Sequence, residues 1–476
     1  MPTVYSAAVD LGATSGRVIL GAWSKHRLTL RDVHRFPNAF RPLGGHDYWD
    51  IAGLWAEVRA GLLKAAAVLP RGARLASVGV DTWGVDYALV NDTGRLVFPV
   101  HAYRDARTRP GLQHLGNTRA ALERLYAATG IPNVFYNTSL QLAEVVAACP
   151  AIADLATRCL FLPDYFNFLL SGRMENELSI ASTSQLLDVH SADWSRTALD
   201  YFHIPAQWFT TPIPAGTRLG PVRGLPGLQG AQAIAVPGHD TASAYDAMPA
   251  APDGSDLFLS SGTWSLVGFE SDTPVLGPAA LRARVANERI GDGRYRPLAN
   301  VPGLFLLEQT LKEFAVRPKT DRDWSALIAA TEKLPAPAVP LDVTDPAFAN
   351  PPSMRAAIDA QLKKRRAVVP RNPAGYARLI CASLGRGHAD VVRAFEAMTG
   401  RKFRRVLVVG GGSKNRLLCQ ATADAAGIPV VSFSLEGTAV GNLASQLVAL
   451  GAVESLATFR RHLAATLKQA TYGPRG

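Results

Sequence analysis

The chain has 476 residues, of which 48% are hydrophobic and 19% are charged. This composition excludes disordered and fibrous proteins, and the length favours two large domains over one core. The net charge is +11, yet the longest basic cluster, residues 363–366, contains no aromatic residue. The pattern therefore does not support a nucleic-acid partner, and the excess charge is interpreted as scattered surface charge.

Four cysteines are spread along the chain without a C-x-x-C pair. Neither a zinc site nor a disulfide framework is therefore predicted. The sequence does not open on a signal-peptide pattern, and it contains no run of 18 apolar residues. These observations predict a soluble, cytoplasmic enzyme with no membrane partner. They leave the oligomeric state open between a monomer and a homodimer.

The first part of the chain alternates strands and helices. Apolar runs predict a hairpin of two strands in residues 4–10 and 17–23 and a third strand in residues 28–35. A helical period predicts a long helix in residues 52–69. Residues 76–81 and 85–90 are expected to form another pair of strands across Thr82-Trp83-Gly84. Thr138 to Gln141 has the spacing of a capping box and predicts the start of a further helix.

The second part repeats one of these patterns. Residues 257–261 and 264–270 lie on either side of a Gly-Thr turn, as the first two strands lie on either side of LGATSG. The repeat is either a coincidence or the sign of two similarly built halves. The sequence then predicts a helix in residues 374–399 and a strand in residues 405–410. A second helix, ending at Ala426, and a last strand in residues 428–433 follow.

Two glycine-rich turns are candidate phosphate sites. In Asp10-Leu-Gly-Ala-Thr-Ser-Gly-Arg17, small residues let backbone N–H groups approach an anion. Asp10 is a candidate Mg²⁺ residue, because Mg²⁺ favours carboxylates beside phosphates. Gly410-Gly-Gly-Ser-Lys-Asn415 lies between a predicted strand and a helix N-terminus, which also favours an anion. An ordinary hairpin and a flexible loop are the alternatives for these two segments.

Two polar clusters are candidate sites for a sugar. In Gly238-His-Asp-Thr-Ala-Ser243, Asp240 can accept the proton of a sugar hydroxyl during phosphoryl transfer. A helix cap would explain the same His-Asp pair. Asp81-Thr-Trp-Gly-Val-Asp86 places a tryptophan between two carboxylates, which is typical of a sugar-binding wall or of a buried anchor.

Together these motifs resemble the FGGY carbohydrate kinases over residues 4–460. In chain order the matching segments are DLGATSGR, VGVDTWGVDYAL, YRDART, LPDYFNFLLSG, GHDTASA, LSSGTWSLVGFE and VVGGGSKNRLLCQATADAAGIPV. The resemblance implies an α/β fold of two actin-like (ribonuclease H-like) domains with a cleft between them, in residues 1–247 and 248–476. It also implies ATP- and Mg²⁺-dependent phosphorylation of a small-molecule sugar. The DTWGVD, PDYF, HDTASA and SSGTWSL forms favour the 1-hydroxyl of a deoxy-ketohexose, with L-rhamnulose as the best candidate.

The resemblance and the motif chemistry assign roles to individual residues. Asp240 matches the proton acceptor of the family, and Asp10 is the candidate metal residue. The candidate sugar contacts are Thr82, Trp83, Gly84, His239, Thr241 and Asn300. The candidate nucleotide contacts are Ala13, Thr14, Ser15, Gly16, Arg17, Thr263, Glu308, Gly410, Gly411, Gly412 and Asn415.

The sequence departs from the family pattern at three places, and at one of them Ser432-Phe433-Ser434 replaces the GP before the late turn, which reads Glu436-Gly-Thr-Ala. Glu308 stands where the resemblance implies a glutamine that contacts the nucleotide, and an NEGG segment reads Asn287-Glu-Arg-Ile290. A carboxylate beside a triphosphate is unfavourable unless a cation or a base contact compensates it. The nucleotide preference and the sugar therefore stay open. The alternatives are a kinase for another substrate, such as L-fuculose, D-xylulose or glycerol, a non-catalytic sugar or nucleotide sensor on the same fold, and an actin-like assembly module.

Overall fold

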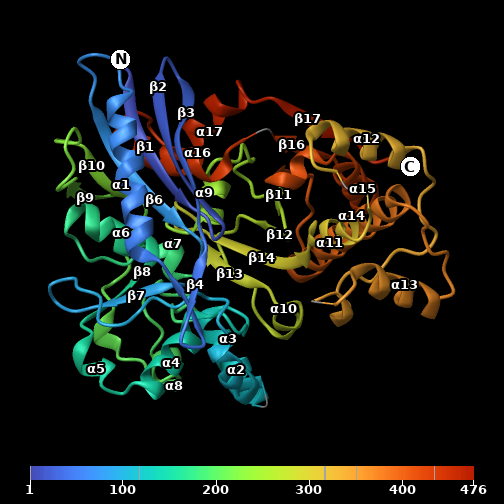
Figure 1. The fold of residues 1–476 in the computed structure, drawn as a ribbon, viewed down its shortest axis with the longest axis horizontal. Coiled ribbons are helices and arrows are strands. Elements are labelled where there is room, and N and C mark those ends of the chain that lie inside the picture. Colours follow the sequence, from blue (N-terminus) through green and yellow to red (C-terminus); the bar gives the residue numbers. More distant parts are fainter. Residues whose placement is uncertain (1, 117, 316–317, 350, 434, 476) are drawn as a thin grey trace. The chain divides into compact units, whose positions relative to one another are not determined.

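The computed structural model describes residues 2–116, 118–315, 318–349, 351–433 and 435–475 (Figure 1). Contacts within the chain divide it into two units. The first unit comprises Met1–Pro249, Ser271–Pro297 and Glu436–Thr466, and the second comprises Ala250–Glu270, Leu298–Leu435 and Leu467–Gly476. Two segments beyond residue 248 thus group with the first unit. The division into domains 1–247 and 248–476 stays a prediction.

A six-stranded sheet forms the centre of the first unit, with the strand order β3-β2-β1-β6-β10-β9. Its strands are β1 (Val4–Leu11), β2 (Ser15–Ser24), β3 (Arg27–Pro37), β6 (Leu75–Thr82), β9 (Thr217–Pro221) and β10 (Gln232–Ala235). β1 pairs with β2 as an antiparallel hairpin and with β6 in parallel. In this register Asp10 lies opposite Arg17 on one side and opposite Asp81 on the other. Strand pairing alone therefore brings two carboxylates and a guanidinium together.

The first unit also contains most of the helices. They are α1 (Ile51–Ala67), α2 (Arg109–Gly116), α3 (Arg119–Thr129), α4 (Thr138–Ala148), α5 (Ile152–Leu155), α6 (Leu162–Ser171), α7 (Leu178–Ala181), α8 (Arg196–Tyr201), α9 (Asp240–Asp246), α10 (Pro278–Arg282), α16 (Gly437–Ala449) and α17 (Leu456–Ala464), with the short 3₁₀ helices η1 (Ala106–Thr108) and η2 (Ala206–Trp208). The smaller strands are β4 (Phe40–Leu43), paired with β5 (His46–Trp49), β7 (Tyr87–Val90), paired with β8 (Arg158–Phe161), and β13 (Ala286–Arg289).

Helices cover both faces of the first sheet (Figure 1). Side chains alternate along a strand, so neighbouring residues of β1 face opposite sides. Val9 lies in the same core as Val58 and Leu62 of α1. Ala8 packs instead with Leu443 of α16. The sheet is therefore buried on both sides, which explains the nearly continuous apolar sequence of β1.

Two local predictions in the first unit are wrong. The strands at residues 75–90 do not pair with each other, because both edges of β6 are already occupied by β1 and β10, and β7 pairs with β8. The chain turns between them with Val85 at a left-handed φ of 70°. The capping box is also absent: Asn137 occupies the N-cap of α4, and the Thr138 hydroxyl donates to the Val85 carbonyl at 2.6 Å. The hydrogen bond from Thr138 to Val85 holds the turn between β6 and β7, and after this turn β7 pairs with β8.

A second sheet has seven strands in the order β13-β14-β12-β11-β15-β16-β17, with β13 and β14 as a paired hairpin at one edge, and it forms the centre of the second unit. Besides β13, which lies in the first unit, its strands are β11 (Asp256–Ser261), β12 (Trp264–Phe269), β14 (Tyr295–Pro302, which begins in the first unit), β15 (Arg405–Val409), β16 (Val430–Phe433) and β17 (Gln469–Tyr472). The helices are α11 (Phe305–Lys312), α12 (Asp321–Glu332), α13 (Met354–Lys364), α14 (Pro373–Thr399) and α15 (Arg416–Ala426), with the 3₁₀ helices η3 (Pro346–Phe348) and η4 (Gly411–Lys414).

The two sheets share one arrangement of strands. In the first, β1 and β2 form an antiparallel hairpin and β6 runs parallel to β1. In the second, β11 and β12 form an antiparallel hairpin and β15 runs parallel to β11. The repeated strand–turn–strand sequence thus reflects two similarly built sheets, one in each unit.

Candidate active site

A cluster of charged side chains surrounds the end of β1. Arg17 binds Asp10 through Nε, 2.8 Å from Oδ2, and through Nη2, 2.6 Å from the same oxygen. Asp81 is fully buried, and its Oδ2 accepts a hydrogen bond of 2.6 Å from Asn442 of α16. Among the described residues, Asp81 Oδ1 has no hydrogen-bond partner. A buried carboxylate with an unpaired oxygen is costly, so this oxygen points to a ligand or a cation.

The carboxylates of this cluster act on one another. Burial raises the pKa of Asp81 well above its usual range, and the charges of Asp10 and Asp240 add to this effect. Burial also raises the pKa of Asp10; Arg17 opposes the rise, while Asp240 and Glu436 add to it. Such mutual repulsion is relieved when positive charge enters the cluster. The site is therefore suited to a cation or a cationic complex.

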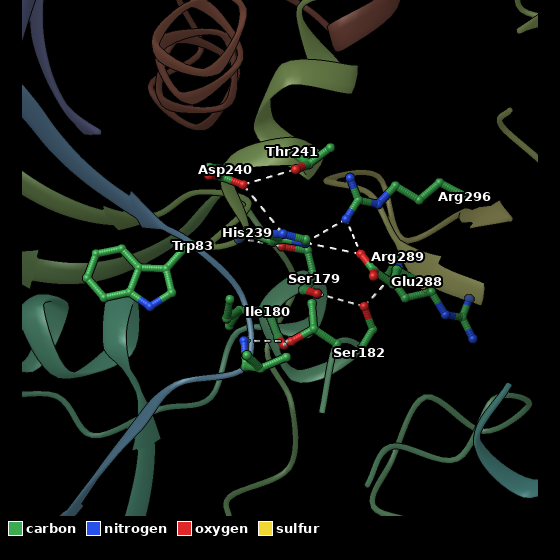
Figure 2. Close-up of polar contacts among 12 residues, drawn as sticks. Trp83, Ser179, Ile180, Ser182, His239, Asp240, Thr241, Glu288, Arg289 and Arg296 are labelled. Carbon is green, nitrogen blue, oxygen red and sulfur yellow. Dashed lines mark hydrogen bonds and ion pairs between the residues drawn. The ribbon is translucent and has the colours of Figure 1, made fainter. Parts of the chain in front are cut away.

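Asp240 is the first residue of α9, and its carboxylate is held through one oxygen. The Thr241 hydroxyl donates to Oδ1 at 3.0 Å, and His239 Nε2 lies 3.4 Å from the same atom (Figure 2). Within the described part of the chain, both polar contacts of the Asp240 side chain are on Oδ1. The side chain is 30% exposed. His239 makes no capping hydrogen bond to α9, so helix capping does not explain this pair.

The turn after β6 contains a buried tryptophan, Trp83, followed by a glycine, Gly84, beside His239. Trp83 is buried, and its Nε1 donates to Asp86 Oδ2 at 2.8 Å, as does Trp49 Nε1 at 2.6 Å. Burial raises the pKa of Asp86 to about 6 even though these hydrogen bonds lower it. Gly84 lies beside His239, because a Cβ atom added there would be 3.3 Å from His239 Nε2. Trp83 is thus an anchored core residue, whereas Gly84 keeps space free near His239.

Thr82 links this turn to the loop before α9. Its backbone N–H donates to the Gly238 carbonyl at 2.8 Å, so the strand β6 holds the His239 loop directly. Its hydroxyl donates to the Trp83 carbonyl at 2.8 Å. Thr82 therefore contributes to the site through its backbone in the structure, and its predicted sugar contact stays a prediction.

The turn between β1 and β2 contains the first group of predicted nucleotide contacts. Ala13 is half-buried, and the side chains of Thr14 and Ser15 are exposed. The Gly12 N–H donates to the Ser15 carbonyl at 2.9 Å, which closes the turn. A Cβ atom at Gly16 would overlap the Phe36 ring, so a glycine is required there. The turn is therefore tight and presents small residues at its tip, as a phosphate-binding turn requires.

The second unit places its predicted site residues on separate elements. Thr263 is exposed in the turn between β11 and β12, and the side chains of Asn300 on β14 and Glu308 on α11 are exposed. Gly410 has a φ of 82°. A Cβ atom at Gly412 would overlap Ser261 Oγ, and this hydroxyl has no hydrogen-bond partner among the described residues.

The glycine loop therefore packs η4 directly against the end of β11. Its Gly411 is exposed and has open space around it. Asn415 follows the loop as the N-cap of α15, where its Oδ1 accepts a hydrogen bond of 3.2 Å from the Leu418 N–H. Capping explains the presence of an asparagine at this position, and its predicted nucleotide contact stays a prediction.

Four residues near the charged cluster were not predicted from the sequence. Glu436 and Arg17 form an ion pair, and Asn442 binds Asp81. Glu288 and Arg296 lie beside His239. The signals for them were two departures from the family pattern, at residues 287–290, which include Glu288, and at the late turn that begins with Glu436; neither departure predicted a contact with Arg17 or His239.

A metal ion at this site would be contacted mainly through water. Within the residues that the structure describes, no group of three or more His, Cys, Asp or Glu side chains could hold a metal ion directly. Asp10 and the unpaired Oδ1 of Asp81 nevertheless suit a hydrated Mg²⁺ ion, which keeps several waters and binds through one or two carboxylates. The residues present therefore fit the metal predicted at Asp10.

Comparison with known proteins identifies the family. Models of the N-terminal and C-terminal domains of the FGGY family of carbohydrate kinases match residues 5–244 and 257–450. The chain belongs to this family. The FGGY kinase is 40% identical to a rhamnulokinase of Enterobacter sp. (strain 638) over 99% of its own length and 94% of that protein. It is also 40% identical to a rhamnulokinase of Klebsiella pneumoniae (strain 342), over 96% of its length and 92% of that protein.

Solved structures show the fold of this FGGY kinase. Plasmodium falciparum glycerol kinase matches 99% of the chain with a TM-score of 0.81 and 14% identity, over 94% of its own length. Xylulose kinase from Rhodospirillum rubrum matches the whole chain with a TM-score of 0.80 and 19% identity, also over 94% of its length. The predicted actin-like (ribonuclease H-like) α/β fold with two sheet-containing parts is thereby confirmed.

The predicted class of enzyme is confirmed as well. Membership of the family makes the protein an ATP-dependent sugar phosphotransferase. A search of the described helices for a membrane-spanning segment finds none that is long and apolar enough.

Proposed function

We propose that this FGGY kinase transfers the γ-phosphoryl group of MgATP to the 1-hydroxyl of L-rhamnulose. The observation that carries the proposal is the half-exposed carboxylate of Asp240, held through Oδ1 beside His239 and electrostatically coupled to Asp10 and Asp81. The choice of sugar is supported by the 40% identity to proteins named rhamnulokinase over nearly the full chain.

In this mechanism Asp240 orients the sugar hydroxyl and accepts its proton. Phosphoryl transfer demands positioning and charge stabilisation more than covalent chemistry, so a well-placed carboxylate and fixed donors suffice. Oδ2 of Asp240 takes the hydroxyl proton, since Oδ1 is already held by Thr241. His239 and Gly84 lie beside the base and line the position of the sugar.

In this proposal the phosphates are contacted by the turn from Ala13 to Gly16 and by the side chain of Arg17. Arg17 lies between Asp10 and Glu436 in the structure, so it is already oriented by two carboxylates. Bound Mg²⁺ would neutralise part of the phosphate charge, and Asp10 and Asp81 would hold it through water. Thr263, Glu308 and the Gly410–Gly412 loop are proposed to contact the nucleotide, and Asn300 is proposed to contact the sugar.

The proposal is tested by Asp240→Asn. We expect the variant to bind ATP and L-rhamnulose with near-normal affinity but to lose kcat by about 1,000-fold or more, because the proton acceptor is gone. Asp200→Asn is the matched control, since Asp200 is an exposed carboxylate paired with Arg196. A coupled assay of ADP release measures both. Turnover of Asp240→Asn within tenfold of the parent enzyme would overturn the role of Asp240.

The substrate is tested with a panel of acceptors. We expect kcat/KM for L-rhamnulose to exceed that for L-fuculose, D-xylulose and glycerol, and ADP release without sugar to be negligible because a closed kinase excludes water. A higher kcat/KM for another sugar would reassign the substrate. Binding of ATP with no turnover of any of these acceptors would identify a sensor instead. Running the panel with GTP tests the nucleotide preference that Glu308 leaves open.

We further propose that the enzyme works in the cytoplasm. All four cysteines are free in the structure, and three of them are buried, which agrees with a reducing compartment. Size-exclusion chromatography with light scattering distinguishes a monomer from a homodimer.

A further inference from the structure

A buried ion pair lies behind His239. Glu288 on β13 and Arg296 on β14 both reach its Nδ1 atom: Glu288 Oε2 is 3.1 Å away and Arg296 Nη2 is 2.5 Å away. Arg296 Nη2 also donates a hydrogen bond to Glu288 Oε2. His239 therefore lies between this pair and Asp240, as Figure 2 shows.

Burying this ion pair costs desolvation free energy, so the pair contributes little to the stability of the fold. The Arg296 side chain is fully buried, and its Nε and Nη1 have no hydrogen-bond partner among the described residues. Its guanidinium carbon lies 5.3 Å from the centre of the Tyr245 ring, which compensates the lost hydration only in part. Buried pairs of this kind are often replaced by apolar residues without loss of stability. Their position beside a proposed base indicates a role in function instead.

Glu288 carries a fixed negative charge. Burial raises the pKa of Glu288, but the charges of Arg296 and His239 and their hydrogen bonds outweigh burial and lower it to about 2. The guanidinium of Arg296 has only donor groups. Nδ1 of His239 thus faces one permanent acceptor and one permanent donor. The hydroxyl-bearing Tyr136 also lies near Glu288, and its pKa is raised mainly by burial.

Both favourable protonation states of His239 place a proton on Nε2. If the ring is neutral and Nδ1 accepts from Arg296, the proton is on Nε2. If the ring is charged, Nδ1–H donates to Glu288 and Nε2 is protonated too. The remaining state, with Nδ1–H and a bare Nε2, would set a lone pair 3.4 Å from the Asp240 carboxylate, which is repulsive. The pair therefore selects a ring that faces Asp240 with an N–H group.

We propose that Glu288 and Arg296 are positioning residues, which keep Nε2 of His239 protonated toward Oδ1 of Asp240 and so leave Oδ2 for the sugar hydroxyl. This inference rests on the proposed function, because it assigns Asp240 as the base. The loop of His239 is fixed independently, because the Gly238 N–H donates to Glu177 at 2.9 Å and the Gly238 carbonyl accepts from the Thr82 N–H at 2.8 Å. The ring protonation, rather than the position of the loop, is what the ion pair controls.

Two single variants make the test specific. Glu288→Gln removes the charged acceptor beside Nδ1 and leaves the donor Arg296, so Nε2 should stay protonated. Arg296→Met leaves only the acceptor Glu288 beside Nδ1, so neutral His239 should shift toward the form with its proton on Nδ1. Selective labelling of the 10 histidines with ¹⁵N and assignment with a His239→Asn variant show which ring nitrogen carries the proton. The same protonated nitrogen in both variants would overturn the proposal.

Arg289→Met is the matched control. Arg289 is a second buried arginine of the same hairpin, and its guanidinium donates to the Val189 and Gly293 carbonyls rather than to His239. Its loss should lower stability but leave the proton of His239 on Nε2, as in the parent enzyme. A loss of the Nε2 proton as large as that in Arg296→Met would show that any damage to the hairpin changes the histidine ring, and would overturn the proposal.

The double variant Glu288→Gln/Arg296→Met guards against misfolding. It removes both charges together, so no unpaired ion is left buried, and we expect a circular dichroism spectrum like that of the parent enzyme. Neutral His239 should lose its preference for the Nε2 proton in the ¹⁵N spectrum, and kcat should fall by about 10- to 100-fold with KM for ATP within threefold. An unchanged Nε2 signal would overturn the inference. The NMR result does not depend on turnover, so failure of the proposed function, seen as no activity of the parent enzyme on L-rhamnulose, is recognised separately.

Discussion

The two sheets of this kinase share an arrangement of strands but not their chemistry. In the first sheet, Asp10 pairs with Arg17 across the hairpin and with Asp81 across the parallel strands. At the corresponding end of the second sheet, Ser260 pairs with Leu266 and Val409. One copy of the motif therefore gathers charge, and the other offers hydroxyls and a glycine loop. Under the proposed function, charge stabilisation falls to the first sheet and nucleotide contact to the glycine loop of the second.

The largest expected effect comes from removing charge in the first sheet. Asp10→Asn should lower kcat by roughly 100- to 1,000-fold, because it removes the carboxylate that orients Arg17 and that would hold a hydrated cation. Ser260→Ala, at the corresponding position of the second sheet, should change kcat by less than about threefold. Steady-state kinetics of both variants check this. Equal losses would contradict the division of roles between the two sheets.

A second test uses two glycines at helix crossings. A Cβ atom at Gly441 of α16 would overlap the Ser243 carbonyl of α9, and one at Gly385 of α14 would lie 2.6 Å from the Ala421 carbonyl carbon of α15. Each glycine-to-alanine change should lower the free energy of unfolding by about 1–3 kcal/mol. Because Asp240 opens α9, only Gly441→Ala should also lower kcat, by about tenfold or more.

Urea unfolding and kinetics on the folded enzyme separate these two effects. Gly385→Ala serves as the control, since α14 and α15 do not contain the proposed base. If Gly385→Ala lowered kcat as much as Gly441→Ala, the loss of kcat would not come from a displacement of Asp240 at the start of α9.

A third test addresses the glycine loop of the second unit. Gly412→Ala should lower the free energy of unfolding by about 1–2 kcal/mol, because the new Cβ atom would overlap Ser261 Oγ, and it should raise KM for ATP several-fold. Gly411→Ala should leave stability unchanged, since nothing lies within 4 Å of its Cβ position. Thermal unfolding and ATP titration provide the measurements. Equal destabilisation by the two changes would contradict the packing of the loop on β11.

A last test concerns the pH dependence of the contribution that Asp86 makes to stability. Its pKa is raised from 3.8 to about 6, so between these values the folded state binds more protons than the unfolded state, and stability falls as the pH rises. Asp86 makes its full contribution to the free energy of unfolding below pH 3.8, and this contribution is lost as the pH rises past about 6. The free energy of unfolding of the parent enzyme minus that of Asp86→Asn should thus fall by about 2–3 kcal/mol from pH 4 to pH 7. A difference that is flat or rises with pH would contradict the burial of an ionised Asp86.

Much of the fold could be predicted because it is encoded locally. The hairpin strands and the helix at residues 374–399 follow from apolar periods and from Gly and Pro at their ends, and α14 indeed spans Pro373–Thr399. The pairing of β6 could not be predicted, because it depends on which strands occupy its edges. The order of strands in a sheet is decided by long-range packing.

The site shows the same division between local and distant information. The turn after Asp10 and the His239-Asp240 pair are visible as short motifs. The partners that set their charge are not: Asn442 reaches Asp81 from 361 residues away, and Arg296 meets His239 from 57 residues away. The interpretation of Trp83 also needed the structure, since only burial and the Asp86 contact distinguish an anchor from a sugar-binding wall.

The late return of the chain to the first unit has a consequence for synthesis on the ribosome. Asn442 and Gln446 of α16 satisfy Asp81 and Ser77 inside the first sheet, and Arg460 of α17 donates to the Tyr245 and Asp246 carbonyls at the end of α9. When residues 1–249 emerge, α16 and α17 have not yet been synthesised. The first sheet can therefore reach its final stability only after nearly the whole chain has been translated, so a prematurely released N-terminal half is a natural target for chaperones and proteases.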